Sequence, residues 1–365
     1  MHKYQTYWNL VKAALWQQPA TWPVEQTEEL LLLNAMQGTG ALVFPSALAQ
    51  DGLSSYARAQ MKSVCMSTMQ QHVKLHHTLS TAWTALEKAG INVVLMKGAT
   101  LAALYPSPEQ RAWGDIDLFV GKEQYHPACA VMRDTFPGAL KFDEELDHYK
   151  HYNIITDGIS IETHRVTMGL QHPLDVKRYA QMEAYGVAHA SDLKIGDLNV
   201  KVFEPTFNAL FVMFHCWEHM LTLGANVRQL CDLTLLLHRY AAQIDRPRLR
   251  KYLNALHLMD VWQLLMYICV NGLGLAIEEA PFYTTKVAQR AEHLMNDLLE
   301  VKLKEPKHEE QAPKARFVRK FHTMLQRFEG ARRIRQYSSA YARHMNATTL
   351  LNGASRLFAK DRHWE

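Results

Sequence analysis

The hydrophobic pattern of this 365-residue chain changes its period twice, and this change limits the folds that the chain can adopt. Apolar residues recur at helical spacing up to about residue 88 and again from residue 205. Between these regions, INVVLMKG (91–98), GDIDLFVG (114–121) and HYNIITDGISIETHR (151–165) contain the short β-branched runs of strands, with an Asp157-Gly158 hairpin turn in the last. We therefore expect an α+β fold in which N-terminal helices and a C-terminal helical bundle flank a small sheet.

The same pattern predicts four regions along the chain. They are an N-terminal helical region (1–88), an α/β core (89–204), a helical bundle (205–304) and a basic helical tail (305–365). Positive charge is concentrated near the C-terminal end. From Val301 onward the chain has fifteen Lys and Arg but only six Asp and Glu, whereas the net charge of the whole chain is +4. Nucleic acid is a candidate partner for this tail, but helical Arg residues are more often simply solvated, so we do not favour it.

The sequence predicts a cytoplasmic protein without a transmembrane segment. Lys, Gln and Trp interrupt the N-terminal apolar residues, which is not the pattern of a signal peptide. The longest apolar run (30–48) is broken by Asn34 and Pro45 before it could span a bilayer. The five cysteines lack CxxC spacing and cannot all pair within one chain, which indicates reduced thiols.

Two aspartates occupy one face of the strand in RAWGDIDLFV (111–120). Side chains at positions i and i+2 of a strand point the same way, so Asp115 and Asp117 lie opposite the face of Ile116 and Leu118. Two ionised carboxylates this close repel each other unless one is protonated or a cation lies between them. Oxygen ligands on a rigid strand suit Mg²⁺, which binds proteins through a few carboxylates, water and substrate phosphates. A solvated strand face is the competing interpretation.

The surrounding segments resemble the polymerase-beta-like nucleotidyltransferases, and in particular a family within that superfamily whose members read roughly LKG…YP…R…DIDLLV…VDLHW. The matching segments are LMKGATLAALYP (95–106), RAWGDIDLFV (111–120) and ISIETHR (159–165). VRQLCDLTLLL (227–237) is similar to the helical signature that follows the catalytic core of that family. The resemblance covers roughly residues 90 to 240 and implies a nucleotidyltransferase core built on a small mixed sheet.

The resemblance also implies a third carboxylate on a neighbouring strand, and the hairpin offers two candidates. Asp157 lies in the turn, where Asp is expected because it tolerates left-handed geometry. Glu162 alternates with Ile161 and Thr163 and is the better candidate, although the family more often has Asp there. His164 shares the face of Glu162, where it could orient a ligand or form a local hydrogen bond.

A different set of residues in this chain corresponds to the part of the family motif that binds the nucleotide. Lys97 and Gly98 end the first strand, and the Ser that usually follows this glycine is replaced by Ala99 and then Thr100. Backbone amides at the start of the following helix could cradle phosphate oxygens, and Lys97 or Arg111 could neutralise them. We therefore assign Lys97, Gly98, Thr100 and Arg111 to the nucleotide.

The activity that the resemblance implies is transfer of a nucleoside monophosphate from an NTP to a hydroxyl group. Asp115, Asp117 and Glu162 would hold Mg²⁺ (or Mn²⁺), and Glu162 would also accept the proton of the attacking hydroxyl. The acceptor is unknown and would be a small molecule, a sugar or a protein. We expect it to approach from the bundle after Pro205, whose polar and aromatic groups include Trp217, His219, Arg228, Tyr240 and Trp262.

Two alternatives remain open from the sequence. The first is a nucleotide-binding module without catalysis, which retention of Asp115, Asp117 and Glu162 argues against. The second is a zinc peptidase, because HCWEH (215–219) matches the H-x-x-E-H pattern, with Glu278 or Glu279 as a distal ligand. The segment around HCWEH has the pattern of a core helix of the bundle, the family resemblance accounts for this helix without a metal, and His is frequent in this chain, so we rank the peptidase lowest.

Overall fold

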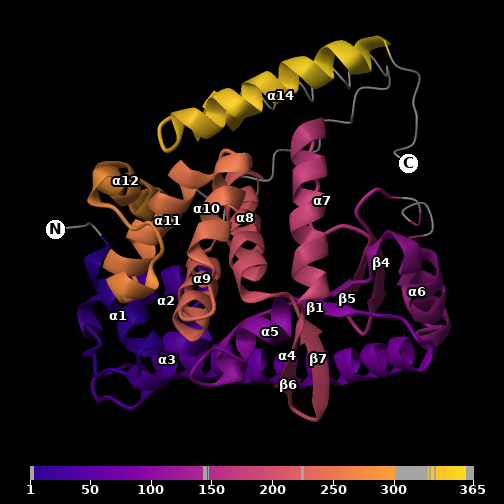
Figure 1. The fold of residues 1–365 in the computed structure, drawn as a ribbon. Helices are drawn as coiled ribbons and strands as arrows, with labels where there is room; N and C mark the ends of the chain where they lie inside the picture. The colour runs from indigo at the N-terminus through magenta and orange to yellow at the C-terminus, as the bar shows by residue number, and fades with distance from the viewer. Residues whose placement is uncertain are drawn as a thin grey trace.

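The computed structural model describes residues 4–142, 146, 148–222, 226–300, 328, 330–332 and 334–358. Its main sheet has the spatial order β1-β2-β5-β4-β3, in which β2 and β5 are parallel and the other neighbours are antiparallel. Helices flank this small mixed sheet, which confirms the predicted α+β class (Figure 1). The strands are β1 (Val94–Met96), β2 (Asp115–Phe119), β3 (Leu140–Lys141), β4 (His151–Thr156) and β5 (Ile159–His164).

The two faces of the main sheet differ in chemistry because its strands alternate apolar and polar residues. Ile116, Leu118 and Ile161 lie on one face, in a buried apolar cluster with residues of α4 (Ser55–Lys88) and α6 (Gly121–Thr135). Asp115 and Asp117 lie on the opposite face. The alternation in GDIDLFV therefore places the carboxylates away from this core.

The Asp157-Gly158 turn joins β4 and β5 as the sequence predicts. Thr156 pairs with Ile159 across the turn, and Asp157 and Gly158 have φ values of 50° and 76°. Both values fall in the left-handed region that a two-residue hairpin of this kind requires, and Asp and Gly tolerate it. A second hairpin, β6 (Ser191–Ile195) and β7 (Leu198–Val202), follows α7 (Pro173–Ala188) and was not predicted.

The N-terminal and C-terminal helices share one hydrophobic core. Tyr7, Trp8 and Phe44 belong to the same buried cluster as Leu236 and Trp262, and Figure 1 shows these distant parts of the sequence side by side. The helices involved are α1 (Gln5–Leu15), α2 (Thr27–Met36), α3 (Gly40–Leu48), α8 (Pro205–Thr222), α9 (Val227–Tyr240), α10 (Arg246–Ala255), α11 (Met259–Asn271) and α12 (Ala288–Leu299). The predicted region boundaries at residues 88, 204 and 304 stay predictions.

Helix α4 follows the sequence signals closely. The Ser54 side chain accepts a hydrogen bond from the Ala57 amide at its start, and Gly90 adopts a φ of 70° just beyond its end. The segment PRLRKYLNALHLMDVWQLLMYICVNGLG (247–274) is interrupted within its helical pattern. It forms α10 and α11, which are separated near His257, where φ is 58°.

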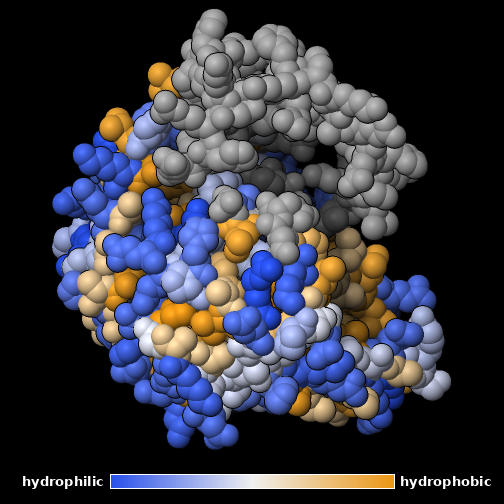
Figure 2. Space-filling model, turned by 90° about the vertical axis from the view of Figure 1, so that its right-hand side faces the viewer, coloured by the Kyte–Doolittle hydropathy of each residue, from blue (hydrophilic) through white to orange (hydrophobic). Residues whose placement is uncertain are grey.

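Several expectations concern the surface and the ends of the chain. All five cysteines are free thiols. Within the described residues, no helix combines the length and the apolar character needed to cross a bilayer. Figure 2 shows hydrophilic residues interspersed with separate apolar patches on one face. The charged stretch 304–315 and much of the predicted basic tail lie outside the described residues, which include α14 (Ser339–Phe358) near the end.

Candidate active site

The connection between β1 and α5 (Gly98–Ala102) has an unusual backbone. Lys97 and Gly98 have φ values of 46° and 41°, which is rare for a residue with a side chain such as Lys97. A Cβ atom at position 98 would lie 3.0 Å from the Trp113 ring and 3.3 Å from the Asp115 carbonyl oxygen. Glycine therefore allows this turn to pack directly against the start of β2.

Asp117 is fully buried at the centre of the polar face. Its Oδ1 atom lies 3.1 Å from Lys97 Nζ and 3.1 Å from His164 Nε2. Its Oδ2 atom is buried without a hydrogen-bond partner among the described residues. Burial opposes ionisation, but Lys97 and His164 outweigh it and hold the pKa of the Asp117 carboxyl below its ordinary value. The buried carboxylate is therefore charged and only half satisfied.

Asp115 is the more accessible of the two aspartates and lines a cleft. The neighbouring charge of Asp117, together with burial, raises the pKa of the Asp115 carboxyl, although Lys97 opposes this effect. This direction is what repulsion between two close carboxylates produces. The folded chain therefore contains the repulsion between Asp115 and Asp117 that a bound cation would relieve.

Glu162 joins the aspartates because β5 runs parallel to β2. The register places Asp117 opposite Glu162 and Asp115 opposite Ser160. Glu162 Oε2 lies 3.0 Å from His164 Nε2. Burial raises the pKa of the Glu162 carboxyl, but the hydrogen bond from His164 and the charges of His164 and His151 together lower it below its ordinary value. Asp157 stays in the hairpin turn. These positions agree with the alternation along the strand, and the choice of Glu162 as the third carboxylate stays a prediction.

Arg111 occupies a buried ion pair with a residue that the sequence did not suggest. Its Nε atom donates to Asp232 Oδ1 at 2.6 Å and its Nη2 atom donates to Asp232 Oδ2 at 2.8 Å. Nη1 donates to the Gly98 carbonyl oxygen at 3.1 Å, and Tyr105 also donates to Asp232, at 2.8 Å. The guanidinium is thus a fixed positive group that ties the β1–α5 turn to α9.

Thr100 is engaged within its own turn. Its hydroxyl donates to the Lys97 carbonyl oxygen at 2.7 Å, and its backbone amide donates to the same oxygen at 2.8 Å. The side chain is buried, with 5% of its surface exposed. Thr100 therefore holds the shape of the nucleotide-side turn, and its direct contact with phosphate stays a prediction.

A cleft of about 100 Å³ lies between the polar sheet face and two bundle helices. The sheet side contributes Asp115 and the β1–α5 turn, and the helical side contributes polar groups of α8 and α9. The lining residues include Lys97, Gly98, Arg111, Asp115, His215, His219, Arg228, Gln229 and Asp232. Three of the residues predicted to bind the nucleotide, Lys97, Gly98 and Arg111, therefore line the same cleft as Asp115. Thr100 lies in the β1–α5 turn beside Lys97 and Gly98.

His215 and His219 line this cleft from α8. Their ring centroids are 4.4 Å apart, and burial, with Lys97 nearby, holds the pKa of His215 well below its ordinary value. The imidazole is thus neutral. Among the described residues, neither Glu278 nor Glu279 forms a close three-ligand group with these histidines, and Glu279 pairs with His238 at 2.8 Å. Within the described residues, three ligand-type side chains that already have one ligand atom each within 4.8 Å of the others are His151, Glu162 and His164.

The acceptor-side expectation needs correction for two aromatic residues. Trp217 and Trp262 have 1% and 0% of their surfaces exposed, so both are core residues that a ligand cannot reach. His219 and Arg228 do line the cleft, and Tyr240 packs against the core. Residue type alone could not show which of these side chains are buried. The amphipathic pattern shows which residues share a face of a helix, but the burial of that face depends on the elements that pack against it.

Comparison with known proteins gives one broad match. A family model described as an uncharacterised nucleotidyltransferase matches residues 23–274 of this chain. A crystal structure of an antigenic nucleotidyltransferase-like protein from Paracoccidioides brasiliensis is similar over 56% of this chain and 93% of that chain, with 14% identity and a TM-score of 0.34. Similarity this weak says nothing about the activity of this chain. No curated protein matches it.

Proposed function

Because the chain belongs to the uncharacterised nucleotidyltransferase family, we propose that it transfers a nucleoside monophosphate from an NTP to a hydroxyl group of an acceptor. The observation that carries this proposal is the register of β2 and β5, which sets Asp117 beside Glu162 and leaves Asp115 two residues away. Three carboxylates on one sheet face repel one another without a cation. Their convergence next to a cleft is readily explained by metal-dependent phosphoryl chemistry.

The donor set fits Mg²⁺ or Mn²⁺. Asp117 Oδ2 is buried without a hydrogen-bond partner among the described residues, and such an oxygen is costly unless a cation or another donor meets it. Carboxylate oxygens are the ligands that these ions prefer. When bound by Asp115, Asp117 and Glu162, the ion would neutralise the triphosphate and lower the pKa of the attacking hydroxyl.

The nucleotide side of the site would be the β1–α5 turn. Lys97 Nζ lies 3.1 Å from Asp117 Oδ1, so an ion bound at Asp117 would free this ammonium group to meet a phosphate oxygen. Gly98 lets the backbone approach closely, and Thr100 maintains the turn. Arg111, held by Asp232, adds fixed positive charge to the cleft wall.

Glu162 would act as the proton acceptor. Its lowered pKa keeps the carboxylate ionised at neutral pH, and its position opposite Asp117 supports this role. The acceptor oxygen would form a bond to the α-phosphorus as the bond to pyrophosphate breaks, and its proton would pass to Glu162. The acceptor would lie along His219, Arg228 and Gln229, whose polar groups suit a small molecule or a protein hydroxyl.

The decisive experiment compares the wild type with Glu162→Gln and Asp157→Asn. Each labelled NTP is incubated with Mg²⁺ and a metabolite, protein or RNA extract, and pyrophosphate release and label transfer are followed by mass spectrometry. We expect Glu162→Gln to keep NTP binding and to lose about 10²- to 10⁴-fold of the transfer rate, as for loss of a general base. Asp157→Asn is the matched control, because this residue lies in the hairpin turn, and it should transfer normally.

Two results would contradict the proposal. Equal transfer by the wild type and Glu162→Gln would remove the assigned base. A wild type that binds NTP tightly but transfers nothing to any acceptor would favour a binding module without catalysis.

A further inference from the structure

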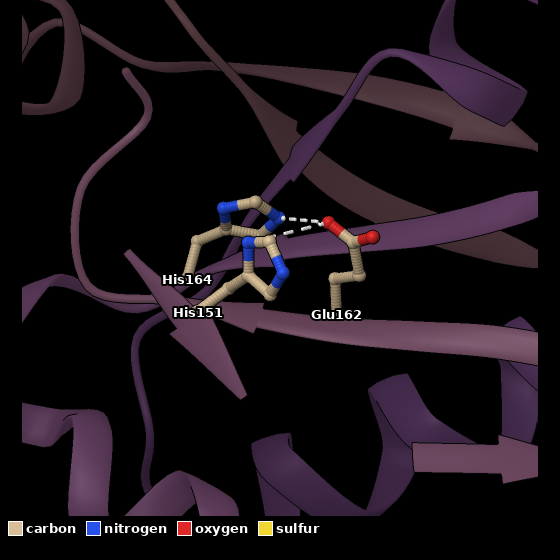
Figure 3. A group of neighbouring side chains, drawn as sticks. All are labelled: His151, Glu162 and His164. Carbon is tan, nitrogen blue, oxygen red and sulfur yellow. Dashed lines mark ion pairs between the residues drawn. The ribbon is translucent and has the colours of Figure 1, made fainter. Parts of the chain in front are cut away.

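A second group of ligand-type side chains adjoins the aspartates on the polar sheet face. His151 comes from β4, and Glu162 and His164 come from β5, where His151 pairs directly with His164. Figure 3 shows both imidazole rings beside the Glu162 carboxylate. One ligand atom from each of the three residues lies within 4.8 Å of the other two. Two adjacent strands therefore fix two imidazoles and a carboxylate around one point.

The spacing of these atoms is close to that of a metal-ligand shell. Glu162 Oε2 lies 3.0 Å from His164 Nε2 and 3.6 Å from His151 Nδ1. In a tetrahedral zinc site with bonds of about 2.0–2.1 Å, neighbouring ligand atoms are about 3.4 Å apart. Both observed distances lie within a few tenths of an ångström of this value.

Hydrogen bonding within the chain leaves this group incompletely satisfied. His151 Nδ1, one of the ligand-type atoms of the group, is buried without a hydrogen-bond partner among the described residues, and so is Asp117 Oδ2 beside the group. Buried polar atoms of this kind are uncommon and usually indicate a missing water, ion or ligand.

We propose that His151, Glu162 and His164 bind a divalent first-row transition-metal ion such as Mn²⁺ or Zn²⁺. Imidazole nitrogen suits these ions, whereas Mg²⁺ prefers oxygen ligands alone. Two histidines and one glutamate are also the protein ligands of one class of zinc centre. The ion replaces the proton that His164 Nε2 shares with the carboxylates, so binding releases a proton. Metal binding by this group does not depend on the proposed transfer reaction, although Glu162 belongs to both.

The test measures Mn²⁺ binding without nucleotide in the wild type, His151→Ala and His148→Ala. Electron spin-echo spectroscopy detects coupling between bound Mn²⁺ and imidazole nitrogen, and titration gives the affinity. His151 is the variant of choice because 22% of its side chain is exposed, so its removal perturbs the fold less than removal of buried His164. His148 is exposed and adjacent but lies outside the ligand group, which makes it the matched control.

We expect the wild type and His148→Ala to show nitrogen coupling. His151→Ala should lose part of this coupling and bind Mn²⁺ at least about tenfold more weakly, because even residues that only support a metal ligand contribute this much. Mg²⁺ affinity should be unchanged by His151→Ala. Wild-type Mn²⁺ without nitrogen coupling, or equal weakening by His148→Ala, would overturn the assignment.

Asp115→Asn separates this inference from the proposed function. Asp115 lies outside the three-residue group, so this variant should retain the nitrogen-coupled Mn²⁺ signal while it loses nucleotidyl transfer. Transfer that is absent from the wild type while the nitrogen coupling persists would remove the proposed function only. Coupling that is absent while the wild type still transfers would remove the metal inference only.

Discussion

Two clusters of charged residues border the same cleft and differ in how completely their hydrogen-bonding groups are satisfied. The closed cluster consists of Arg111, Asp232 and Tyr105, in which both carboxylate oxygens of Asp232 accept hydrogen bonds. The open cluster consists of Asp115, Asp117, Glu162, His151 and His164, which includes three carboxylates and buried polar atoms without partners among the described residues. A closed cluster stabilises the fold by itself, whereas an open cluster is satisfied only when a ligand arrives.

The clusters are joined through one backbone group, and this explains why they lie so close. Arg111 donates to the Gly98 carbonyl oxygen, and the residue before Gly98 is Lys97, which pairs with Asp117. The closed cluster therefore positions the turn that brings the Lys97 ammonium group to Asp117 in the open cluster. We therefore expect substitutions in the closed cluster to change mainly the stability of the fold, and substitutions in the open cluster to change mainly the response to a ligand.

The largest effect is expected from breaking the closed cluster with Asp232→Asn. The substitution leaves the buried Arg111 charge uncompensated, so the free energy of unfolding should fall by about 3–5 kcal/mol. Denaturant titration measures this loss. The double variant Arg111→Met/Asp232→Leu removes both charges and should recover most of it. A loss below about 1 kcal/mol in Asp232→Asn would show that the cluster is not the structural support that its hydrogen bonds suggest.

The closed cluster also marks the limit of what the sequence could predict. Alternation along β2 and β5 predicts that Asp115 and Asp117 share a face and favours Glu162 over Asp157, because strand geometry depends on neighbouring residues alone. The partner of Arg111 is 121 positions away. No local pattern identifies such a partner.

The helical side of the cleft was hidden for a related reason. HCWEH predicts a helix with His215 and His219 on one face, and the structure confirms that helix. Which face of α8 meets the sheet depends on how the helix packs against the core. The sequence therefore could not show that His215 lines the cleft and that Trp217 is buried. The shared core of the terminal helices is another consequence of long-range packing.

An intermediate effect is expected from Gly98→Ala, at the junction of the two clusters. A side chain at φ 41° is strained, and its Cβ would lie 3.0 Å from the Trp113 ring. We expect a loss of about 1–3 kcal/mol in the free energy of unfolding. Gly114→Ala is the matched control, because a Cβ there would meet nothing within 4 Å, and its effect should stay within about 0.5 kcal/mol. Equal effects of the two variants in denaturant titration would contradict the junction role of Gly98.

The smallest effect, and the one of opposite sign, is expected from Asp115→Asn in the open cluster. The charge of Asp117 raises the pKa of the Asp115 carboxyl, so the folded chain resists ionisation of this residue, and a neutral Asn relieves the repulsion. Without metal, the variant should be as stable as the wild type or more stable by up to about 1 kcal/mol.

Added Mg²⁺ stabilises whichever chain binds it, so it should raise the melting temperature of the wild type more than that of the Asp115→Asn variant. Asp192→Asn, which alters an exposed pair with Lys201, should respond to Mg²⁺ like the wild type. Scanning calorimetry with and without Mg²⁺ measures all three chains, and a metal-free loss of stability in Asp115→Asn comparable to that of Asp232→Asn would mean that both clusters are structural.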